Sequence, residues 1–377
     1  WPICHFMTLY ISDKLRVYCP EDQHFLNFFP FRFYLNEILV IGDTTIVLYI
    51  FMKKQIFGTI LSRSPFIFSI LFNDLIAYKK ELESWVEEKA PDQKNIYALV
   101  TLWWHYETPE RMAPVPEQLR QFRETAPRIT PIFFCNSELE RKNFEAIGER
   151  AVFCNHNAFL LENRFGVTKT KRIYDAVYLA RITPFKRYEL AKDVLRLLAI
   201  GNYSEKESEY AHKTLAMLSA DKVWIPKIYG IFVYKYLNKA KVGLALSAEE
   251  GAMYAATEYG LCGLPVLSTR NRGGREYSLC PDYIRILQTD TPTAKDVAEG
   301  VEYLIEQKFN PYDIRQATIA IQKRHREYYK NLITQLFDEA HQGSKKNFQM
   351  AMNFPHKLGL RTCKPWERFF QNRCIKL

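Results

Sequence analysis

The chain has 377 residues, which is more than a single hydrophobic core usually organises, so its length predicts two domains of roughly 150 to 200 residues each. Hydrophobic residues make up 47%, charged residues 25% and aromatic residues 15%, a composition that excludes disordered and collagen-like classes. The formal net charge is +10.

Two apolar runs, residues 33–52 and 65–78, are interrupted by polar side chains, and neither supplies the ~18 uninterrupted apolar residues of a membrane-spanning helix. We therefore expect buried strands and core helices there. The eight cysteines show neither a C-x-x-C pair nor a Cys/His cluster at zinc spacing. They are predicted to be reduced, mostly buried thiols of a cytoplasmic protein.

The first half alternates β-rich and helical patterns. Buried strands are predicted at residues 46–51, 97–103 and 132–135, and helices at residues 71–88 and 137–147. Ser137 is a hydroxyl that can cap the second of these helices, and Gly148 is placed to end it.

A short basic stretch at residues 166–172 interrupts this pattern, and we predict a domain boundary there. The second half then predicts strands at residues 174–180, 222–224, 242–246 and 265–268, separated by helices at residues 188–198, 228–240 and 253–261. Such alternation predicts an α/β architecture with a parallel, doubly wound sheet.

The most informative stretch is residues 247–277, SAEEGAMYAATEYGLCGLPVLSTRNRGGREY. Glu250 follows a predicted strand, at the edge where parallel sheets bind ligands, and Glu258 lies eight residues further on. The helix is expected to start near Gly251, so the backbone N–H groups of Gly251, Ala252 and Met253 would favour a phosphate there.

Several motifs in this order resemble the donor site of retaining GT-B glycosyltransferases of the family-4 type (glycosyl transferases group 1). They are the E-x7-E pair of Glu250 and Glu258, the G-x-P-V of residues 263–266, and the Gly-Gly-x-Glu that begins at Gly273. In that family an Arg and a Lys precede these motifs, and Arg181 and Lys186 fit those positions.

The resemblance implies two Rossmann-like domains that face a central cleft, and it implies a role for each motif residue. Glu250 would hold hydroxyls of the donor sugar, and Glu258 the ribose hydroxyls. The turn at Gly273 and Gly274 would let the backbone approach the donor.

Cationic stabilisation replaces a metal in this interpretation. Arg181 and Lys186, together with the helix start, would stabilise the departing nucleoside diphosphate. No Asp-x-Asp occurs in the chain, so the metal-chelating signature of the other major glycosyltransferase fold is missing. We expect no metal and no cofactor beyond the nucleotide-sugar substrate.

His105 follows the strand predicted at residues 97–103. Relatives often place a histidine at such a turn, facing the donor sugar, so His105 is a candidate catalytic residue, with a buried or stacking histidine as the alternative. The neighbouring aromatic residues Trp103, Trp104 and Tyr106 suit core packing better than a sugar-stacking platform. His156 is the weaker candidate of the two histidines.

The full interpretation divides the chain into residues 1–170 for the acceptor, residues 171–325 for the nucleotide-sugar donor, and a basic segment, residues 326–377, that packs back on the first domain. The protein would transfer a sugar, with retention, to a glycan or lipid-linked acceptor in polysaccharide biosynthesis. Two alternatives remain open: a nucleotide-sugar epimerase or phosphorylase on the same fold, and a non-catalytic nucleic-acid or membrane-binding protein.

The last part of the chain is strongly basic. From Ile321 onward there are twelve Lys or Arg residues against four acids, a net charge of +8. Nucleic acid, an anionic membrane and plain solvent are all compatible with such a tail. We expect no nucleic-acid partner, because this charge lies outside the donor motifs; peripheral contact with the inner face of a membrane stays open.

Overall fold

The computed structural model describes residues 38–41, 44–47, 58–94, 96–218, 221–226, 228, 230–341 and 343–360. The chain forms two compact units, Trp1–Gln55 and Ile56–Leu377. In the first unit, strands β1 (Ile38–Ile41) and β2 (Thr44–Val47) pair antiparallel. Residues 48–51 of the strand predicted at 46–51 lie outside the described residues.

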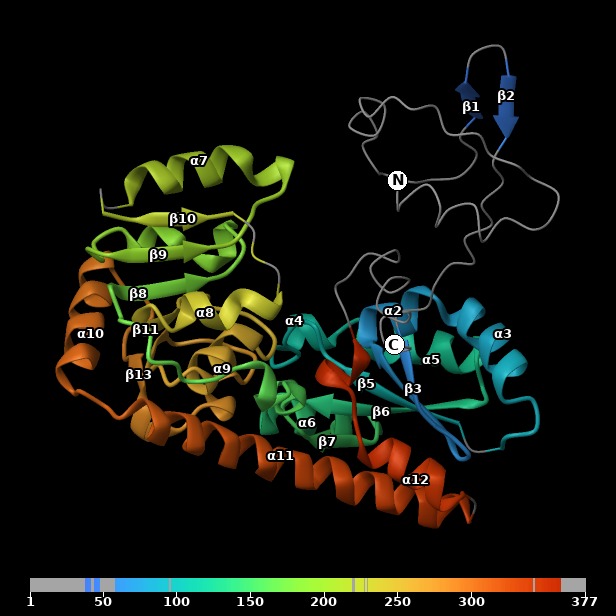
Figure 1. Ribbon diagram of the computed structural model, residues 1–377. Helices are drawn as coiled ribbons and strands as arrows, with labels where there is room; N and C mark the ends of the chain where they lie inside the picture. Colours follow the sequence, from blue (N-terminus) through green and yellow to red (C-terminus); the bar gives the residue numbers. More distant parts are fainter. Residues whose placement is uncertain are drawn as a thin grey trace. The chain divides into compact units, whose positions relative to one another are not determined.

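The second unit contains two sheets, the first with five strands in the order β3-β4-β5-β6-β7 (Figure 1). Its strands are β3 (Gly58–Arg63), β4 (Phe66–Leu71), β5 (Ile96–Thr101), β6 (Ile129–Cys135) and β7 (Ala151–Phe153). Its helices are α2 (Phe72–Ala77), α3 (Lys79–Lys89), α4 (Pro109–Met112), α5 (Val115–Thr125) and α6 (Glu138–Ala146). Only the β3–β4 pair is antiparallel, so the remaining strands direct their carboxyl ends toward one edge.

The second sheet has six parallel strands in the order β10-β9-β8-β11-β12-β13. They are β8 (Tyr174–Leu179), β9 (Leu197–Ile200), β10 (Val223–Ile225), β11 (Ala240–Ala245), β12 (Val266–Thr269) and β13 (Ile284–Leu287). The associated helices are α7 (Ser208–Met217), α8 (Val233–Leu237), α9 (Tyr254–Leu261) and α10 (Ala294–Glu306). The chain therefore has the predicted α/β class with two Rossmann-like sheets.

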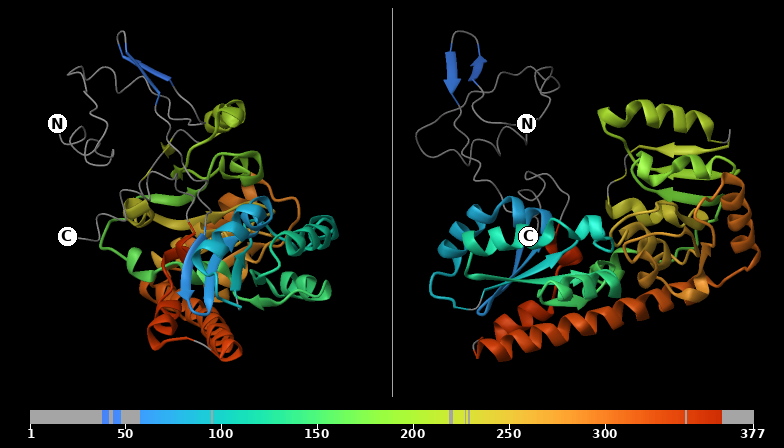
Figure 2. Two further views of the ribbon diagram at one scale, coloured as in Figure 1. Left: turned by 90° about the vertical axis from the view of Figure 1, so that its right-hand side faces the viewer. Right: turned by 180° about the vertical axis from the view of Figure 1, so that it is seen from behind.

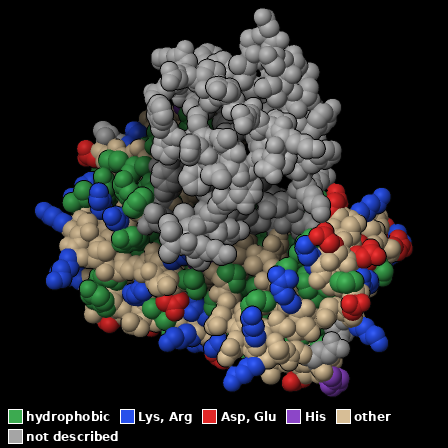
Figure 3. Space-filling model, turned by 45° about the vertical axis from the view of Figure 1, so that its right-hand side comes forward, with side chains coloured by type: hydrophobic (Ala, Val, Ile, Leu, Met, Phe, Trp, Pro, Cys, Tyr) green, Lys and Arg blue, Asp and Glu red, His purple; other side chains and the backbone are tan. Residues whose placement is uncertain are grey.

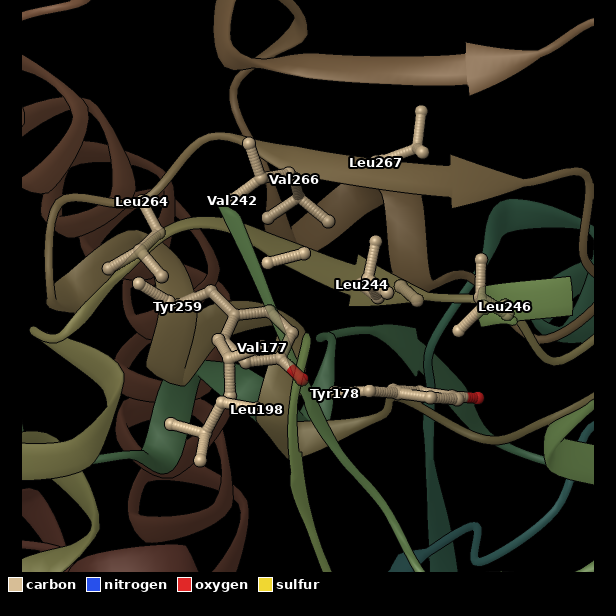
Figure 4. Packing of buried hydrophobic residues seen from close by; sticks show 14 of the residues in the cluster. Val177, Tyr178, Leu198, Val242, Leu244, Leu246, Tyr259, Leu264, Val266 and Leu267 are labelled. Carbon is tan, nitrogen blue, oxygen red and sulfur yellow. The ribbon is translucent and has the colours of Figure 1, made fainter. Parts of the chain in front are cut away.

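The core of the second sheet is dominated by aliphatic side chains of its central strands. Val177 of β8, Leu244 of β11 and Leu267 of β12 pack there with Tyr259 of α9, and all four are fully buried (Figure 4). The Tyr259 hydroxyl accepts the backbone N–H of Leu179 at 2.7 Å. This packing fixes α9, which carries Glu258, against β11, the strand that precedes Glu250.

The chain ends in a long helix, α11 (Pro311–Ala340), followed by α12 (Lys345–Met352) and a short helical turn, η10 (His356–Gly359). Figure 2 shows α11 running past both sheets. Its first half touches α9, where Thr318 lies against Gly260, and its second half adds Tyr329 and Ile333 to the core of the first sheet. The C-terminal segment thus contacts elements of both sheets.

Several predicted elements are confirmed, and Ser137 caps α6 as predicted, by accepting the backbone N–H of Glu140. Three helices differ from the prediction. The helix predicted at 188–198 is only a short turn, η5 (Tyr188–Ala191), because the apolar residues Leu197 and Leu198 enter the buried strand β9.

The other two differences also have local causes. The helix predicted at 228–240 is reduced to α8 after a turn at Gly230–Phe232, and Ala240 already belongs to β11. The helix predicted at 71–88 is divided at Tyr78, whose backbone leaves the helical region, and Leu71 ends β4.

Within the described part of the chain, no helix combines the length and apolarity needed to cross a membrane. Cys135, Cys154 and Cys262 are buried free thiols, as predicted, whereas Cys280 is half-buried. The other four cysteines, Cys4, Cys19, Cys363 and Cys374, lie outside the described residues. On the face drawn in Figure 3, Lys and Arg side chains are interspersed with carboxylates.

Candidate active site

The loop after β8 carries both predicted cations. Lys186 lies in a short turn, η4 (Pro184–Lys186), and its carbonyl accepts a hydrogen bond from the buried hydroxyl of Tyr178. The Tyr188 hydroxyl donates to the carbonyl of Ala180 at 2.7 Å. These two tyrosines hold the loop, so the Lys186 ammonium is placed by the core of the sheet.

Lys186 forms an ion pair with Glu250, and both side chains are largely buried, at 9% and 14% exposed. Burial lowers the pKa of Lys186, although the neighbouring Glu250 carboxylate opposes that change. The other carboxylate oxygen of Glu250 accepts from the hydroxyl of Ser247. Because isolated buried charges are costly, each partner makes burial of the other tolerable.

The loop that carries Glu250 packs closely against the turn at Gly273 and Gly274. The Glu250 N–H donates to the carbonyl of Arg272 at 3.0 Å. Gly273 has φ = +116°, and a Cβ built on it would lie 1.6 Å from the Glu250 carbonyl oxygen. A Cβ on Gly274 (φ = +78°) would lie 2.2 Å from the carbonyl oxygen of Asn136. Both positions therefore require glycine, as the predicted close approach implies.

His105 lies in the loop after β5 and is buried. Its Nε2 atom lies 3.3 Å from a carboxylate oxygen of Glu249, without hydrogen-bond geometry. The Cβ of His105 would be 3.3 Å from a Cβ on Gly273, so the histidine is next to the glycine turn. The two sheets thus bring His105 beside the Glu249–Glu250 loop, although the carboxylate next to its ring is that of Glu249 and not that of Glu250.

Gly251, Ala252 and Met253 do not begin the helix, which corrects the sequence expectation. Met253 has a left-handed backbone (φ = +48°), and α9 starts at Tyr254. Asn157 donates its side-chain amide to the carbonyl of Ala252 at 2.5 Å, and a Cβ on Gly251 would lie 2.6 Å from the carbonyl oxygen of Trp103. Side chains and backbone from the first sheet thus hold this loop.

Arg181 and Glu258 have ion-pair partners other than Lys186 and Glu250. Arg181 is 58% exposed and pairs with Glu207 at 2.9 Å. Glu258 lies within α9 and is buried, and this burial raises the pKa of its carboxyl group. Its nearest charged partner is Lys357, whose Nζ lies 3.9 Å away. The structure therefore gives these two residues and the Lys186–Glu250 pair separate charged partners.

Two further residues of this region could not be predicted from the sequence. The Glu107 carboxylate accepts the backbone N–H of Gly273 at 3.0 Å and the hydroxyl of Ser137, so it ties the glycine turn to the first sheet. Arg275 is fully buried and donates to Ser268 and to the carbonyl of Thr269, both at 2.8 Å. The only available signals were the position of Glu107 near His105 and that of Arg275 within the glycine motif.

The aromatic residues near His105 have different environments. Trp103 is 52% exposed, whereas Tyr106 packs edge-on against the core residue Phe72, with ring centroids 5.4 Å apart. Trp104 contacts Phe185 of the second sheet at a centroid distance of 5.3 Å. Core packing is therefore observed for Tyr106 but not for Trp103. His156, the weaker histidine candidate, is buried and contacts the Tyr254 hydroxyl.

Residues 167–325 match the family described as glycosyl transferases group 1. The matched segment covers less than half of the chain, and it carries Lys186, Glu250 and Glu258. No match was found among curated protein sequences. The match confirms the predicted class of enzyme, a retaining, nucleotide-sugar-dependent glycosyltransferase.

Solved structures support the fold of the chain. The Anabaena protein HepE in complex with UDP is 13% identical, with a TM-score of 0.50 over 72% of this chain and 78% of that one. Sucrose-phosphate synthase from Thermosynechococcus elongatus is 14% identical, with a TM-score of 0.50 over 71% of this chain and 79% of that one. These similarities confirm the predicted GT-B fold.

Proposed function

We propose that the protein transfers a sugar from a nucleotide-sugar donor to a glycan or lipid-linked acceptor, with retention of configuration and without a metal. The observation that carries the proposal is the buried pair of Lys186 and Glu250, in which the Glu250 backbone packs against the Gly273 turn beside His105. A buried ammonium at the strand edge suits the charge that develops on a departing diphosphate. The donor we favour is a UDP-sugar, since HepE has been solved with UDP.

Each side chain has a distinct role in this proposal. Glu250 accepts donor-sugar hydroxyls, while Lys186 and Arg181 face the diphosphate, which would compete with Glu250 for the Lys186 ammonium. Glu258 accepts the ribose hydroxyls, and the N–H groups of Gly251, Ala252 and Met253 approach the phosphates. His105 faces the sugar. The leaving phosphate then takes the acceptor proton on the face from which it departs.

In this proposal the two substrates bind to different parts of the chain. Residues 1–170 would bind the acceptor and residues 171–325 the donor, with residues 326–377 packed back on the first domain. Among the described residues, no group of three or more His, Cys, Asp or Glu side chains is arranged to hold a metal ion. Metal independence and the proposed contact of the basic segment with a membrane both remain predictions.

The test is donor consumption followed by proton NMR. The purified protein is given a panel of UDP- and GDP-sugars with simple glycosides as acceptors, with and without excess chelator. We expect turnover of an α-linked donor to give an α-linked product and to continue in chelator, because fixed cations perform the charge stabilisation. A β-linked product, or activity that chelator abolishes and added metal restores, would contradict the proposal.

The same spectra distinguish the rival reactions. An epimerase would convert one nucleotide sugar into its isomer without releasing nucleoside diphosphate. A phosphorylase would consume orthophosphate together with glycan and release a sugar phosphate, without consuming nucleotide sugar, and its pyridoxal group would be visible by absorbance.

A further inference from the structure

The C-terminal turn η10 lies outside the matched family domain but reaches the glutamate to which we assign the ribose. Lys357, in this turn, places its Nζ 3.9 Å from a carboxylate oxygen of Glu258. The same ammonium lies 4.1 Å from the centroid of the Tyr254 ring, one helical turn before Glu258. The two partners are 99 positions apart in the sequence, so only the course of α11 and α12 brings them together.

The backbone of η10 is held firmly in the first sheet. The Leu358 carbonyl accepts the hydroxyl of Ser69 at 2.7 Å, and the Leu358 side chain is fully buried. A Cβ on Gly359 would lie 2.2 Å from the hydroxyl oxygen of Thr59. His356 accepts the N–H of Leu161 at 3.1 Å. The turn is therefore anchored on both sides of Lys357.

This anchoring supports an uncommon backbone conformation. Lys357 and Leu358 have φ values of +56° and +51°, in the left-handed region that non-glycine residues seldom adopt. Such residues persist where the surrounding structure over-determines them, and they cluster at functional sites. Here the result is that a largely covered lysine, 28% exposed, is aimed at Glu258 rather than at solvent.

We propose that Lys357 is a positioning residue of the donor site, which keeps the Glu258 carboxylate ionised so that it can accept the two ribose hydroxyls of the bound nucleotide. This inference rests on the proposed function of Glu258. It gives the C-terminal segment a role in donor binding, although that segment lies beyond the matched domain. The cation also offsets the burial of Glu258, which is only 11% exposed.

The Lys357 ammonium shifts the pKa of Glu258 in the direction that the proposal requires. Burial raises the pKa of Glu258, and the Lys357 ammonium lowers it. Among the described residues, three titratable groups around Glu258 and Lys357 remain neutral at ordinary assay pH: burial holds the pKa of Tyr254 and Tyr259 above its usual range and lowers that of His156 to about 3. Burial likewise raises the pKa of the Cys262 thiol to about 12. Removing Lys357 should therefore raise the pKa of Glu258 further.

The test measures the dissociation constant of UDP by calorimetry between pH 5.5 and 8.5, in the wild type and in Lys357→Met. An ionised carboxylate is required, so the affinity should fall about tenfold for each pH unit below the pKa of Glu258. In Lys357→Met this fall should begin at a higher pH, so that UDP binds the variant about tenfold more weakly than the wild type near neutral pH. Lys357→Arg should restore the wild-type profile.

Two controls test whether the effect is specific to Lys357 and whether it acts through Glu258. Lys346→Met removes an exposed cation of α12 and should leave the profile unchanged. In a Glu258→Gln background, Lys357→Met should have no further effect on UDP affinity, because the lysine acts through that carboxylate. An unchanged pH profile in Lys357→Met, or an equal loss in the Glu258→Gln background, overturns the inference. Failure of the wild type to bind any nucleotide would instead refute the proposed function.

Discussion

Replacing Lys186 with Met is expected to lower glycosyl transfer by about 100- to 1,000-fold, the usual effect of removing one electrostatic donor from the departing group. The variant should also lose about 3–5 kcal/mol of unfolding free energy, because it leaves Glu250 buried without its partner. Turnover and chemical denaturation measure these two effects separately. Lys192→Ala, an exposed lysine just after the same loop, is the matched control and should change neither quantity.

A second substitution, combined with Lys186→Met, separates the loss of catalysis from the loss of stability. In Lys186→Met combined with Glu250→Gln, no unpaired charge is buried, so most of the lost stability should return. Transfer should stay low, because the ammonium that faces the diphosphate is still missing. Recovery of both quantities would show that the pair only stabilises the fold and would remove Lys186 from the site.

Gly273→Ala is expected to have the next largest effect, for a steric reason. Its Cβ would lie 1.6 Å from the Glu250 carbonyl oxygen, at a backbone φ of +116° that disfavours any side chain. The Glu250 loop must therefore move, and we expect a loss of at least about 2 kcal/mol of unfolding free energy, with a fall in transfer of more than about tenfold. Thermal denaturation and turnover provide the measurements.

Gly166→Ala is the control for this glycine, because a Cβ there would meet nothing within 4 Å. It should retain wild-type stability and activity. If Gly273→Ala were equally well tolerated, the tight fit between the glycine turn and the Glu250 loop would not exist in solution.

The parts of the site that the sequence predicts share a common origin. Lys186 and Glu250 both follow strands, β8 and β11, and these strands pair directly in the parallel sheet. Residues that follow neighbouring parallel strands meet at one edge, so local patterns are sufficient to bring them together. The cap at Ser137 is predictable for a similar reason, because it depends on a single helical turn.

The unpredicted parts depend on contacts between distant segments. Glu107 reaches Gly273 across the two sheets, and Lys357 reaches Glu258 only because α11 returns to the first sheet. No periodicity encodes either contact. The wrong helix at residues 188–198 has another cause, since a short apolar run such as Leu197–Ile200 suits a helix or a buried strand equally well until its neighbours are known.

The measurement that tests the central claim most directly is the thermal stabilisation of the protein by UDP and UDP-sugars in excess chelator. At about 100 times the dissociation constant, a nucleotide that binds the folded protein should add about 2.7 kcal/mol of stability. We predict this gain for the wild type and a much smaller one for Glu258→Gln, compared at the same ligand concentration. If no nucleotide or nucleotide sugar stabilises the wild type, or if the variant is stabilised as strongly, the donor site is not where we place it.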